Sequence, residues 1–244
     1  MLRYRLLTFD VNNTLIQVRN TAGDHYRRVA KMFGVEAKVP DLNRGFRVAY
    51  KEQVAVHPNF GATTGLTPEQ WWTNVIFRTF LTAGYTLKEG ILDKISSKLY
   101  QDFSTSQTWE TFPEVKEMLT FLNRNGVALG VLSNNDERLM SVLQSLDLAP
   151  HFSFVLSSSE MKCEKPDAAF FRLALDRLAI DPALCAHIGD NVELDYFGAK
   201  AVGMDAYLVD RKGSTEENWP DISKDHILSD ISDLETKIFK MPSV

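Results

Sequence analysis

Four short polar segments of this sequence carry side chains that could act together in chemistry. They supply three carboxylates, at Asp10, Asp190 and Asp195, an ammonium group at Lys165 and a hydroxyl group at Ser133. Oxygen ligands of this kind could hold a divalent cation, and a bound cation together with one lysine can reverse an acidic local field. The groups are therefore compatible with a site for a phosphorylated small molecule, provided that the fold brings them together.

Each of these segments also has an ordinary structural explanation. A single aspartate after a strand commonly caps a helix or forms a turn, and the proline after Lys165 suits a first helical turn. Ser133, which two asparagines follow, could cap the next helix, and Gly189-Asp190 could be a tight turn. Four independent caps explain the pattern less well than one shared site, because all four segments follow or adjoin strands of the expected sheet.

The elements that must position these residues alternate between strands and helices from Phe112 onward. Short apolar runs predict strands near residues 6–9, 127–132, 154–156, 186–188 and 206–209. Apolar residues at helical spacing predict helices near 115–125, 139–146, 170–178 and 193–202. This alternation indicates an α/β fold with a mainly parallel sheet and helices on both faces. Because ligands bind beyond the carboxyl ends of such strands, we expect the four segments to meet along one edge.

The stretch from residue 17 to residue 108 has a different pattern. It contains helical candidates near residues 23–33, 42–54, 69–83 and 87–103, with no convincing strand among them. We therefore expect an α-helical module, inserted after the first strand. Residues 1–16 and 109–244 would form the sheet domain, which has a comfortable size for a single core.

Composition excludes several classes of protein. The 244 residues are 44% hydrophobic and 24% charged, which is typical of globular domains, and the formal net charge is −5. An acidic chain without a run of Lys or Arg is a poor candidate for nucleic-acid binding, and no apolar stretch approaches the ~20 residues of a membrane helix. Two cysteines, Cys163 and Cys185, indicate neither a disulfide scaffold nor a zinc site, so we expect a reducing, cytoplasmic location.

Taken together, the four segments resemble the haloacid dehalogenase superfamily of hydrolases. Residues 10–14, Asp-Val-Asn-Asn-Thr, are similar to its first motif, and Ser133 stands where its second motif has a hydroxyl residue. Lys165-Pro166 resembles the third motif, and residues 189–195, Gly-Asp-Asn-Val-Glu-Leu-Asp, match the GDxxxxD pattern of the fourth. This resemblance covers the whole chain. It implies a Rossmann-like, doubly wound parallel sheet core with an inserted α-helical cap of the C1 type at residues 17–108.

The resemblance further implies a Mg²⁺-dependent phosphatase that acts on a small phosphorylated metabolite. Asp10 would attack phosphorus and become an aspartyl-phosphate, the covalent strategy of a carboxylate nucleophile. Asp10, the backbone carbonyl of Asn12, Asp190 and Asp195 would hold Mg²⁺, with Asp195 as a direct or an indirect ligand. Water would fill the remaining positions, as is usual for this ion.

The remaining site residues would bind and neutralise the phosphoryl group. By the same resemblance, Lys165 would limit repulsion among Asp10, the metal ligands and the phosphate. Thr14, Ser133 and Asn134, with nearby backbone N–H groups, would contact the phosphoryl oxygens. Positioning and charge neutralisation supply most of the catalysis in phosphoryl transfer.

Asn12 departs from the pattern of the family's phosphatases. Those enzymes have a second aspartate two residues after the nucleophile, which protonates the leaving group and then activates water. An amide can donate a hydrogen bond but has no titratable proton near neutral pH. Loss of general acid–base help typically lowers a rate by ~10²–10⁴.

Three functions are consistent with this departure. The first is a phosphatase that is slow or restricted to leaving groups that need no protonation, such as acyl or aryl phosphates. The second is a non-catalytic protein that binds a phosphorylated ligand or a protein partner. The third is a carbon–halogen hydrolase, because the family's dehalogenases also lack the second aspartate. Those dehalogenases, however, need no metal and have lost the acidic fourth motif that Asp190 and Asp195 keep.

Two further groups of residues have competing interpretations. His57, Phe60, Trp71 and Trp72 are candidates for cap residues that face the substrate, although aromatic side chains at helical spacing more often belong to a core. His187 lies in an expected buried strand, and a hydrogen-bonded core residue is the favoured interpretation over a catalytic base.

Overall fold

The computed structural model describes residues 2–88, 90–213, 219 and 222–239. Two compact units make up the chain. The first unit contains residues 1–17, 111–134 and 147–244, and the second contains residues 18–110 and 135–146. The second unit thus includes most of the expected helical insertion and also residues 135–146. The assignment of residues 17–108 to a cap domain stays a prediction.

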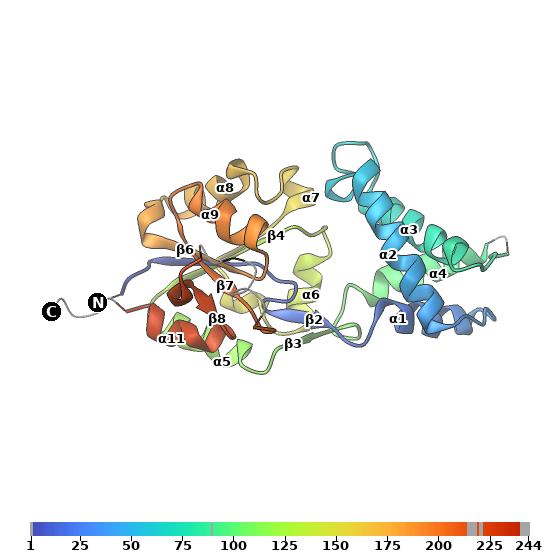
Figure 1. The fold of residues 1–244 in the computed structure, drawn as a ribbon, viewed down its shortest axis with the longest axis horizontal. Coiled ribbons are helices and arrows are strands. Elements are labelled where there is room, and N and C mark those ends of the chain that lie inside the picture. Colours follow the sequence, from blue (N-terminus) through green and yellow to red (C-terminus); the bar gives the residue numbers. More distant parts are fainter. Residues whose placement is uncertain (1, 89, 214–218, 220–221, 240–244) are drawn as a thin grey trace. The chain divides into compact units, whose positions relative to one another are not determined.

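The first unit is built on a parallel sheet of six strands, in the order β5-β4-β1-β6-β7-β8. The strands are β1 (Leu6–Phe9), β4 (Ala128–Ser133), β5 (Phe154–Ser157), β6 (Cys185–Gly189), β7 (Asp205–Val209) and β8 (Ile227–Leu228). Helices α8 and α9 lie on one side of this sheet and α5 and α11 on the other, which gives the layered architecture in Figure 1. The predicted α/β, Rossmann-like core is confirmed.

The helices that the structure describes in the first unit are α5 (Val115–Arg124), α7 (Ser158–Met161), α8 (Ala168–Leu178), α9 (Gly198–Lys200) and α11 (Leu234–Lys237). Of these, α5 and α8 lie where the periodicity predicts helices. Leu6 of β1 and Leu132 of β4 pack with Phe171 of α8 in one buried cluster, and the next residue of β1, Leu7, is also fully buried. Strands buried on both faces explain why their sequences are continuous apolar runs and not alternating ones.

The segment after β6 differs from the ordinary helix expected near 193–202. It begins with a π-helical turn, Val192–Phe197, in which Tyr196 N donates to Asn191 O. The Asn191 side chain accepts from the backbone N–H groups of Glu193 and Leu194, which caps the turn. Such wider turns are rare and frequently occur at functional sites. Here the turn carries Asp195 back toward the end of β6.

The second unit consists of helices. They are α1 (Ala22–Met32), α2 (Val39–Val56), α3 (Pro68–Thr82), α4 (Ile91–Asp102) and α6 (Leu139–Ser145). Thr21 and Thr67 form capping boxes at the starts of α1 and α3, which is a sequence signature of a helix start. A short ribbon of β2 (Ile16–Val18) and β3 (Trp109–Thr111), which sequence analysis missed, lies where the chain leaves the first unit and returns.

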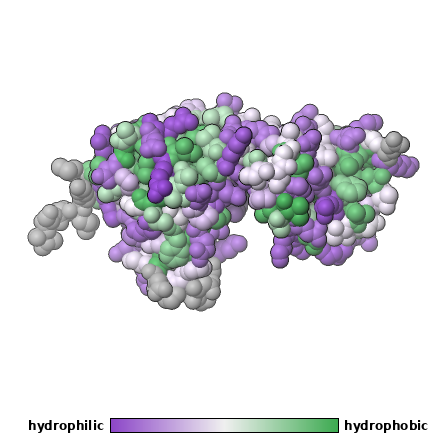
Figure 2. All heavy atoms as spheres, turned by 90° about the horizontal axis from the view of Figure 1, so that it is seen from above, coloured by the Kyte–Doolittle hydropathy of each residue, from purple (hydrophilic) through white to green (hydrophobic). Residues whose placement is uncertain are grey.

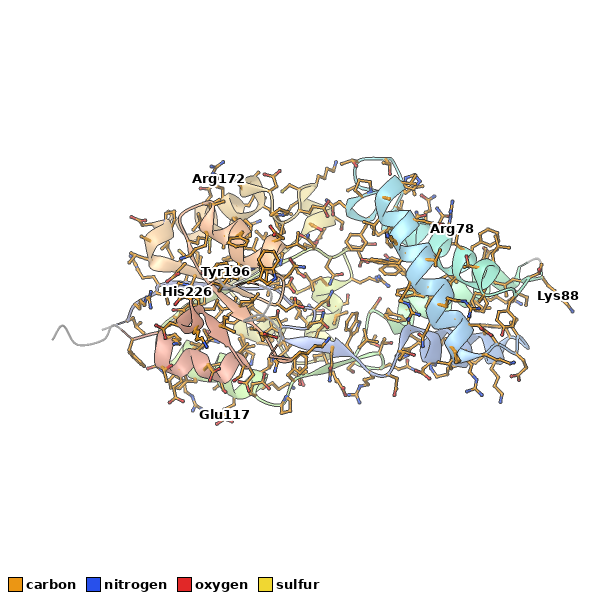
Figure 3. The ribbon with its side chains drawn as sticks, viewed as in Figure 1. Arg78, Lys88, Glu117, Arg172, Tyr196 and His226 are labelled. Carbon is orange, nitrogen blue, oxygen red and sulfur yellow. The ribbon has the colours of Figure 1, made fainter. Side chains whose placement is uncertain are left out.

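A polar network closes the end of the sheet at which β1 begins. The Tyr4 hydroxyl donates to Asp205 Oδ2 at 2.6 Å, and Arg3 and Lys200 pair with the same carboxylate at 2.8 Å each. Burial opposes ionisation, but these partners lower the pKa of Asp205 to about 2. Nearby, Tyr196 and His226 form a 3.0 Å hydrogen bond, and both are labelled in Figure 3. The network ties the start of β1 to β7.

The surface mixes both kinds of side chain, with green hydrophobic residues among purple hydrophilic ones in Figure 2. Exposed apolar side chains of the helical unit include Val48, Phe77 and Leu81. Among the helices that the structure describes, none is long and apolar enough to cross a membrane.

Candidate active site

Strand register brings the carboxyl ends of three neighbouring strands together. Phe9, the last residue of β1, is level with Val131 in β4 and with Ile188 in β6. Asp10 therefore follows the central strand between Ser133, which ends β4, and Asp190, which follows β6. The expected meeting of these segments along one sheet edge is what the structure shows.

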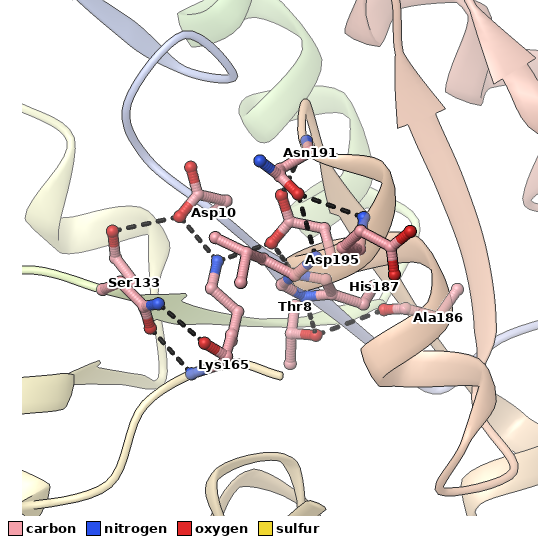
Figure 4. A network of polar contacts seen from close by, with 11 residues as sticks. Thr8, Asp10, Ser133, Lys165, Ala186, His187, Asn191 and Asp195 are labelled. Atoms are coloured by element: carbon pink, nitrogen blue, oxygen red, sulfur yellow. Dashed lines mark hydrogen bonds and ion pairs between the residues drawn. The ribbon is translucent and has the colours of Figure 1, made fainter. Parts of the chain in front are cut away.

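Lys165 is the centre of the polar network (Figure 4). Its Nζ lies 2.6 Å from Asp10 Oδ1 and 2.6 Å from Asp195 Oδ1, and its side chain is 2% exposed. Burial disfavours the ammonium form, yet the two carboxylates raise the pKa of Lys165. The lysine therefore stays charged and joins two aspartates that belong to different motifs.

Asn134 orients the backbone of this lysine. Its Nδ2 donates to Lys165 O at 2.9 Å, and its Oδ1 accepts from Lys165 N at 2.8 Å. Both ends of the amide are thus engaged by the loop of the third motif. Sequence analysis expected Asn134 to contact substrate, whereas these contacts favour a role in holding Lys165 in place.

Asp10 accepts hydrogen bonds from Ser133 and Lys165 on the same carboxylate oxygen, Oδ1. Ser133 Oγ donates to Asp10 Oδ1 at 3.1 Å, beside the contact with Lys165 Nζ. Ser133 and Asp10 are both nearly inaccessible to solvent. Charge-assisted hydrogen bonds of this kind fix the orientation of a carboxylate. The arrangement holds the Asp10 side chain in one rotamer, with Oδ2 on the opposite side of its carboxyl group.

Asp195 is held by contacts to both of its oxygens. His187 Nε2 lies 3.0 Å from Oδ1, which also receives Lys165, and Asn191 N donates to Oδ2 at 2.9 Å. His187 Nδ1 lies 2.9 Å from Thr8 Oγ1. Burial opposes ionisation, but Lys165 and the hydrogen bond from His187 lower the pKa of Asp195 below its usual range. Asp195 is therefore a fixed, ionised partner of the lysine.

Asp190 completes a cluster that fits a metal ion. Ligand oxygens of Asp10, Asp190 and Asp195 all lie within 4.8 Å of one another. Burial, followed by the negative charges of Asp10 and Asp195, raises the pKa of Asp190 to about 6. Three carboxylates around one lysine leave a surplus of negative charge, and a divalent cation with oxygen ligands would offset it. The donor set therefore fits Mg²⁺.

Two predicted residues in the loop after β1 have buried, unpaired polar atoms. Asn12 Oδ1 and Thr14 Oγ1 are both shielded from solvent and have no hydrogen-bond partner among the described residues. Buried polar atoms are nearly always hydrogen-bonded, so such exceptions require an explanation. A ligand or an ordered water at this loop would satisfy them.

Sequence analysis did not anticipate the contact between His187 and Asp195. The pattern did contain a signal, because Thr8 and His187 are polar residues in otherwise apolar strands. The two residues are paired in register between β1 and β6, so they form one polar position in the sheet interior. Gly189 lies two residues after His187, on the same face of the strand. That face is the one on which Asp195 packs.

Gly189 is required by the close approach of Asp195. A Cβ atom at residue 189 would lie 2.2 Å from Asp195 Cγ and 2.3 Å from its Oδ2. We therefore expect Gly189→Ala to displace the Asp195 carboxylate and to weaken Mg²⁺ binding by at least about 10-fold, the usual scale for a disturbed metal environment. Isothermal titration calorimetry with MgCl₂ checks this. Asp176→Asn, at an exposed position of α8, is the control and should bind Mg²⁺ like the wild type.

The aromatic residues predicted for the cap form a cluster within the second unit. Trp71 is buried and donates from Nε1 to His57 O at 2.7 Å, and Phe60 packs against its ring. Trp72 donates from Nε1 to buried Asp136 Oδ2 at 2.7 Å. Trp71 is therefore a core residue of this unit. That any of these side chains faces a substrate stays a prediction.

Known proteins resemble this chain over nearly its whole length. Residues 4–203 match the family model "haloacid dehalogenase-like hydrolase". The chain is 39% identical over 234 residues to haloacid dehalogenase-like hydrolase domain-containing protein 3 of Mus musculus, covering 96% of this chain and 93% of the mouse protein. It is 33% identical over 248 residues to the rhythmically expressed gene 2 protein of Drosophila melanogaster, covering 97% and 95% of the two chains.

A solved structure supports the fold. The chain superposes with a TM-score of 0.71 and 15% identity on the putative HAD-hydrolase YfnB from Bacillus subtilis, described as bound to magnesium, with coverage of 97% and 99% of the two chains. Identity this low establishes the fold alone. The family model, which matches residues 4–203, and the mouse and fly relatives, which are similar over nearly the whole chain, establish the family. The chain belongs to the haloacid dehalogenase-like hydrolase family.

Proposed function

We propose that the protein is a Mg²⁺-dependent phosphatase that acts on a small phosphorylated metabolite through an aspartyl-phosphate at Asp10. The observation that carries this proposal is the double contact of Lys165 Nζ, at 2.6 Å from both Asp10 and Asp195, beside the third carboxylate of Asp190. A hydrolase that uses a carboxylate nucleophile on an anionic substrate needs both an ionised nucleophile and positive charge near it. Burial raises the pKa of Asp10, and the Lys165 ammonium at 2.6 Å opposes that rise. The lysine thus supplies positive charge beside the nucleophile, and a bound cation would add to it.

Asp10, Asp190 and Asp195, with the backbone carbonyl of Asn12, are the residues that we assign to the metal. When bound, Mg²⁺ would supply positive charge that offsets the phosphoryl oxygens and the carboxylates around them. The structure of YfnB from Bacillus subtilis, a fold neighbour that is described as bound to magnesium, supports this choice of ion. The raised pKa of Asp190, about 6, means that this carboxylate is still mostly ionised and able to bind a cation at neutral pH.

The proposed chemistry begins at Asp10. Because Lys165 and Ser133 both contact Oδ1, we assign Oδ2 as the oxygen that forms the bond to phosphorus. The bond from phosphorus to the leaving-group oxygen breaks, and the leaving group keeps the electron pair. We assign Lys165 and Ser133, which both contact Asp10, as the donors to the phosphoryl oxygens. Water hydrolyses the aspartyl-phosphate in a second step, which releases inorganic phosphate and restores Asp10.

Asn12 limits which substrates can react. Its amide can donate a hydrogen bond to the leaving oxygen but cannot give it a proton. Substrates whose leaving group is stable as an anion, such as acyl and aryl phosphates, would therefore react faster than alkyl phosphates.

Asn12 also favours a second candidate function. If the missing acid makes turnover negligible, the same pocket would serve to bind a phosphorylated ligand without chemistry. A carbon–halogen hydrolase is the weakest alternative, because the acidic pair of Asp190 and Asp195 is retained in a metal-compatible cluster.

The decisive experiment measures phosphate release from para-nitrophenyl phosphate by the purified full chain in MgCl₂. We expect release by the wild type and none by Asp10→Asn. Asp176→Asn, an exposed aspartate on α8, is the matched control and should keep full activity. If the wild type and Asn12→Asp are both silent across a broad panel of phosphate esters, the binding function replaces the enzymatic one. Halide release from 2-haloacids in EDTA would revive the dehalogenase alternative.

The pKa of Asp190 predicts how stability without metal depends on pH. Because this pKa is raised from 3.8 to about 6, the folded protein holds the Asp190 proton more tightly than the unfolded chain does. The contribution of Asp190 to the free energy of unfolding therefore falls as pH rises from about 4 to about 6, and stays low above that. In EDTA, Asp190→Asn should melt above the wild type at pH 7.5, with the difference in Tm shrinking toward pH 4. Thermal denaturation by circular dichroism checks this. A difference that does not change with pH would contradict the prediction, and Asp176→Asn should show none.

A further inference from the structure

We propose that His187 is a positioning residue, which uses a proton on Nε2 to aim Asp195 at Lys165. This inference deepens the proposed function and rests on it for its catalytic consequence. Neither the motifs of the family nor the metal-compatible cluster includes His187. The proposal stands on a buried chain of contacts that runs from the sheet interior to the candidate nucleophile (Figure 4).

The chain of contacts is continuous and buried. Thr8 and His187 are each 0% exposed, and Asp195 and Lys165 are each 2% exposed. Thr8 Oγ1 lies 2.9 Å from His187 Nδ1, and His187 Nε2 lies 3.0 Å from Asp195 Oδ1. The same oxygen of Asp195 accepts Lys165 Nζ, which also contacts Asp10. Each group thus limits the position of the next.

The hydrogen-bond geometry assigns the tautomer of His187. The single hydroxyl proton of Thr8 can point to Ala186 O at 3.4 Å or to His187 Nδ1 at 2.9 Å. The contact with Asp195 decides between them, because a carboxylate oxygen can only accept. The proton of a neutral ring therefore lies on Nε2, and Nδ1 accepts from the Thr8 hydroxyl. Nε2–H then donates to Asp195 Oδ1. The opposite tautomer would place an unprotonated nitrogen against a carboxylate oxygen in a buried site, which is unfavourable.

Packing fixes the plane of the imidazole ring. Phe171 meets His187 edge to face, with ring centroids 5.3 Å apart and an interplanar angle of 88°. Because Thr8 holds one nitrogen and Phe171 limits rotation, the Nε2–H direction is set before any ligand arrives. Preorganised donors of this kind orient a carboxylate more precisely than a flexible side chain can.

Asp195 therefore receives its orientation from the protein interior. His187 and Lys165 donate to Oδ1, and Asn191 N donates to Oδ2. Without His187, one donor is lost, and Oδ1 can rotate away from its position beside Lys165 Nζ. The second anchor of the lysine would loosen, and its distance to Asp10 would be less well defined. Loss of such a supporting partner typically lowers metal affinity or activity by ~10–100-fold.

The test combines variants with a readout that does not depend on activity. In ¹⁵N-labelled full-length protein at pH 7.5, long-range ¹H–¹⁵N spectra should show His187 as the neutral ring with its proton on Nε2. Thr8→Val, which removes the hydroxyl donor with little change in shape, should move the ring toward a mixture of tautomers. A proton on Nδ1 in the wild type, or no response to Thr8→Val, would overturn the proposal.

Mg²⁺ titration and kinetics test the positioning role itself. His187→Leu should weaken Mg²⁺ binding and lower kcat by about 10–100-fold, with KM changed by less than about threefold. His187→Gln, whose amide nitrogen can replace the Nε2–H donor, should recover most of the loss. His25→Leu removes a buried histidine of the second unit and should change neither quantity. Equal losses in the Gln and Leu variants, or none in either, would overturn the proposal.

These outcomes separate the two proposals. If the wild type releases no phosphate from para-nitrophenyl phosphate, the phosphatase proposal fails, while the tautomer and the Mg²⁺ affinity still test His187. If the wild type is active and His187→Leu binds Mg²⁺ and turns over like the wild type, the positioning role fails and the phosphatase proposal stands. Should His187→Leu fail to fold, His187→Gln and Thr8→Val carry the same measurements.

Discussion

Replacing Asn12 with aspartate is expected to raise the turnover of alkyl phosphates by at least about 100-fold, the lower end of what general acid–base help contributes. Asn12 Oδ1 is buried without a partner among the described residues, in the loop that also carries Asp10. A carboxyl group in its place could give a proton to the leaving oxygen and later take one from water. An amide can do neither.

The dependence on leaving group distinguishes this explanation from a general gain in activity. For the wild type, log kcat should fall steeply as the leaving-group pKa rises across a series of aryl and alkyl phosphates. For Asn12→Asp the slope should be shallow, with the largest gain for alkyl esters and little for para-nitrophenyl phosphate. The double variant Asp10→Asn, Asn12→Asp is the control and should be inactive. An equal gain for every ester would show that the missing acid is not the limitation.

The meeting of the four segments could be predicted because it depends on topology. A parallel sheet places the carboxyl ends of its strands on one edge, so Asp10, Ser133 and Asp190 had to converge once their strands were recognised. The predictions of β1, β4, β5, β6 and β7 were accurate because strands buried on both faces are continuous apolar runs, whereas the two-residue strand β8 was not predicted. The structure bears out these elements to within a residue or two at their ends.

What the sequence could not predict depends on side-chain direction. Asn134 was expected at the substrate, yet both ends of its amide contact the Lys165 backbone, and no spacing rule shows where an amide will find partners. The π-helical turn could not be predicted from the sequence either. Its backbone hydrogen bonds join residues five apart, whereas those of an α-helix join residues four apart. His187 looked like a satisfied core residue and is one. Its partner on one side, however, is Asp195 of the candidate site.

The candidate site is stable as folded only because its charges compensate one another. Asp10 and Asp195 are buried carboxylates, and one ammonium group touches both. A buried ion pair contributes little net stability when it replaces apolar residues, but removal of one partner leaves an uncompensated buried charge. Burial, followed by the charges of Asp10 and Asp195, raises the pKa of Asp190 to about 6, so a third negative charge is disfavoured in this cluster. Lys165 therefore has a structural role as well as the catalytic one that we propose.

Lys165→Met is accordingly expected to lower both activity and stability. The thioether keeps the length of the side chain but leaves Asp10 and Asp195 without their shared cation, at a cost of about 3–5 kcal/mol in the free energy of unfolding. For a chain of this size that corresponds to a drop in Tm of about 6–20 °C. Phosphate release should fall by about 10²–10³-fold or more, the usual loss when one charge-stabilising group is removed. Urea denaturation and para-nitrophenyl phosphate hydrolysis measure the two effects.

The pH dependence of this loss identifies its cause. Without the ammonium group, the pKa values of the buried carboxylates rise, so protonation in mildly acidic buffer relieves part of the repulsion. The stability difference from the wild type should therefore be smaller at pH 5 than at pH 8, and added Mg²⁺ should restore part of it at pH 8 by replacing the lost positive charge. Lys162→Met, an exposed lysine in the same loop, is the control and should be near wild type in both assays. A deficit of equal size at both pH values, insensitive to Mg²⁺, would show that lost packing and not uncompensated charge causes the instability.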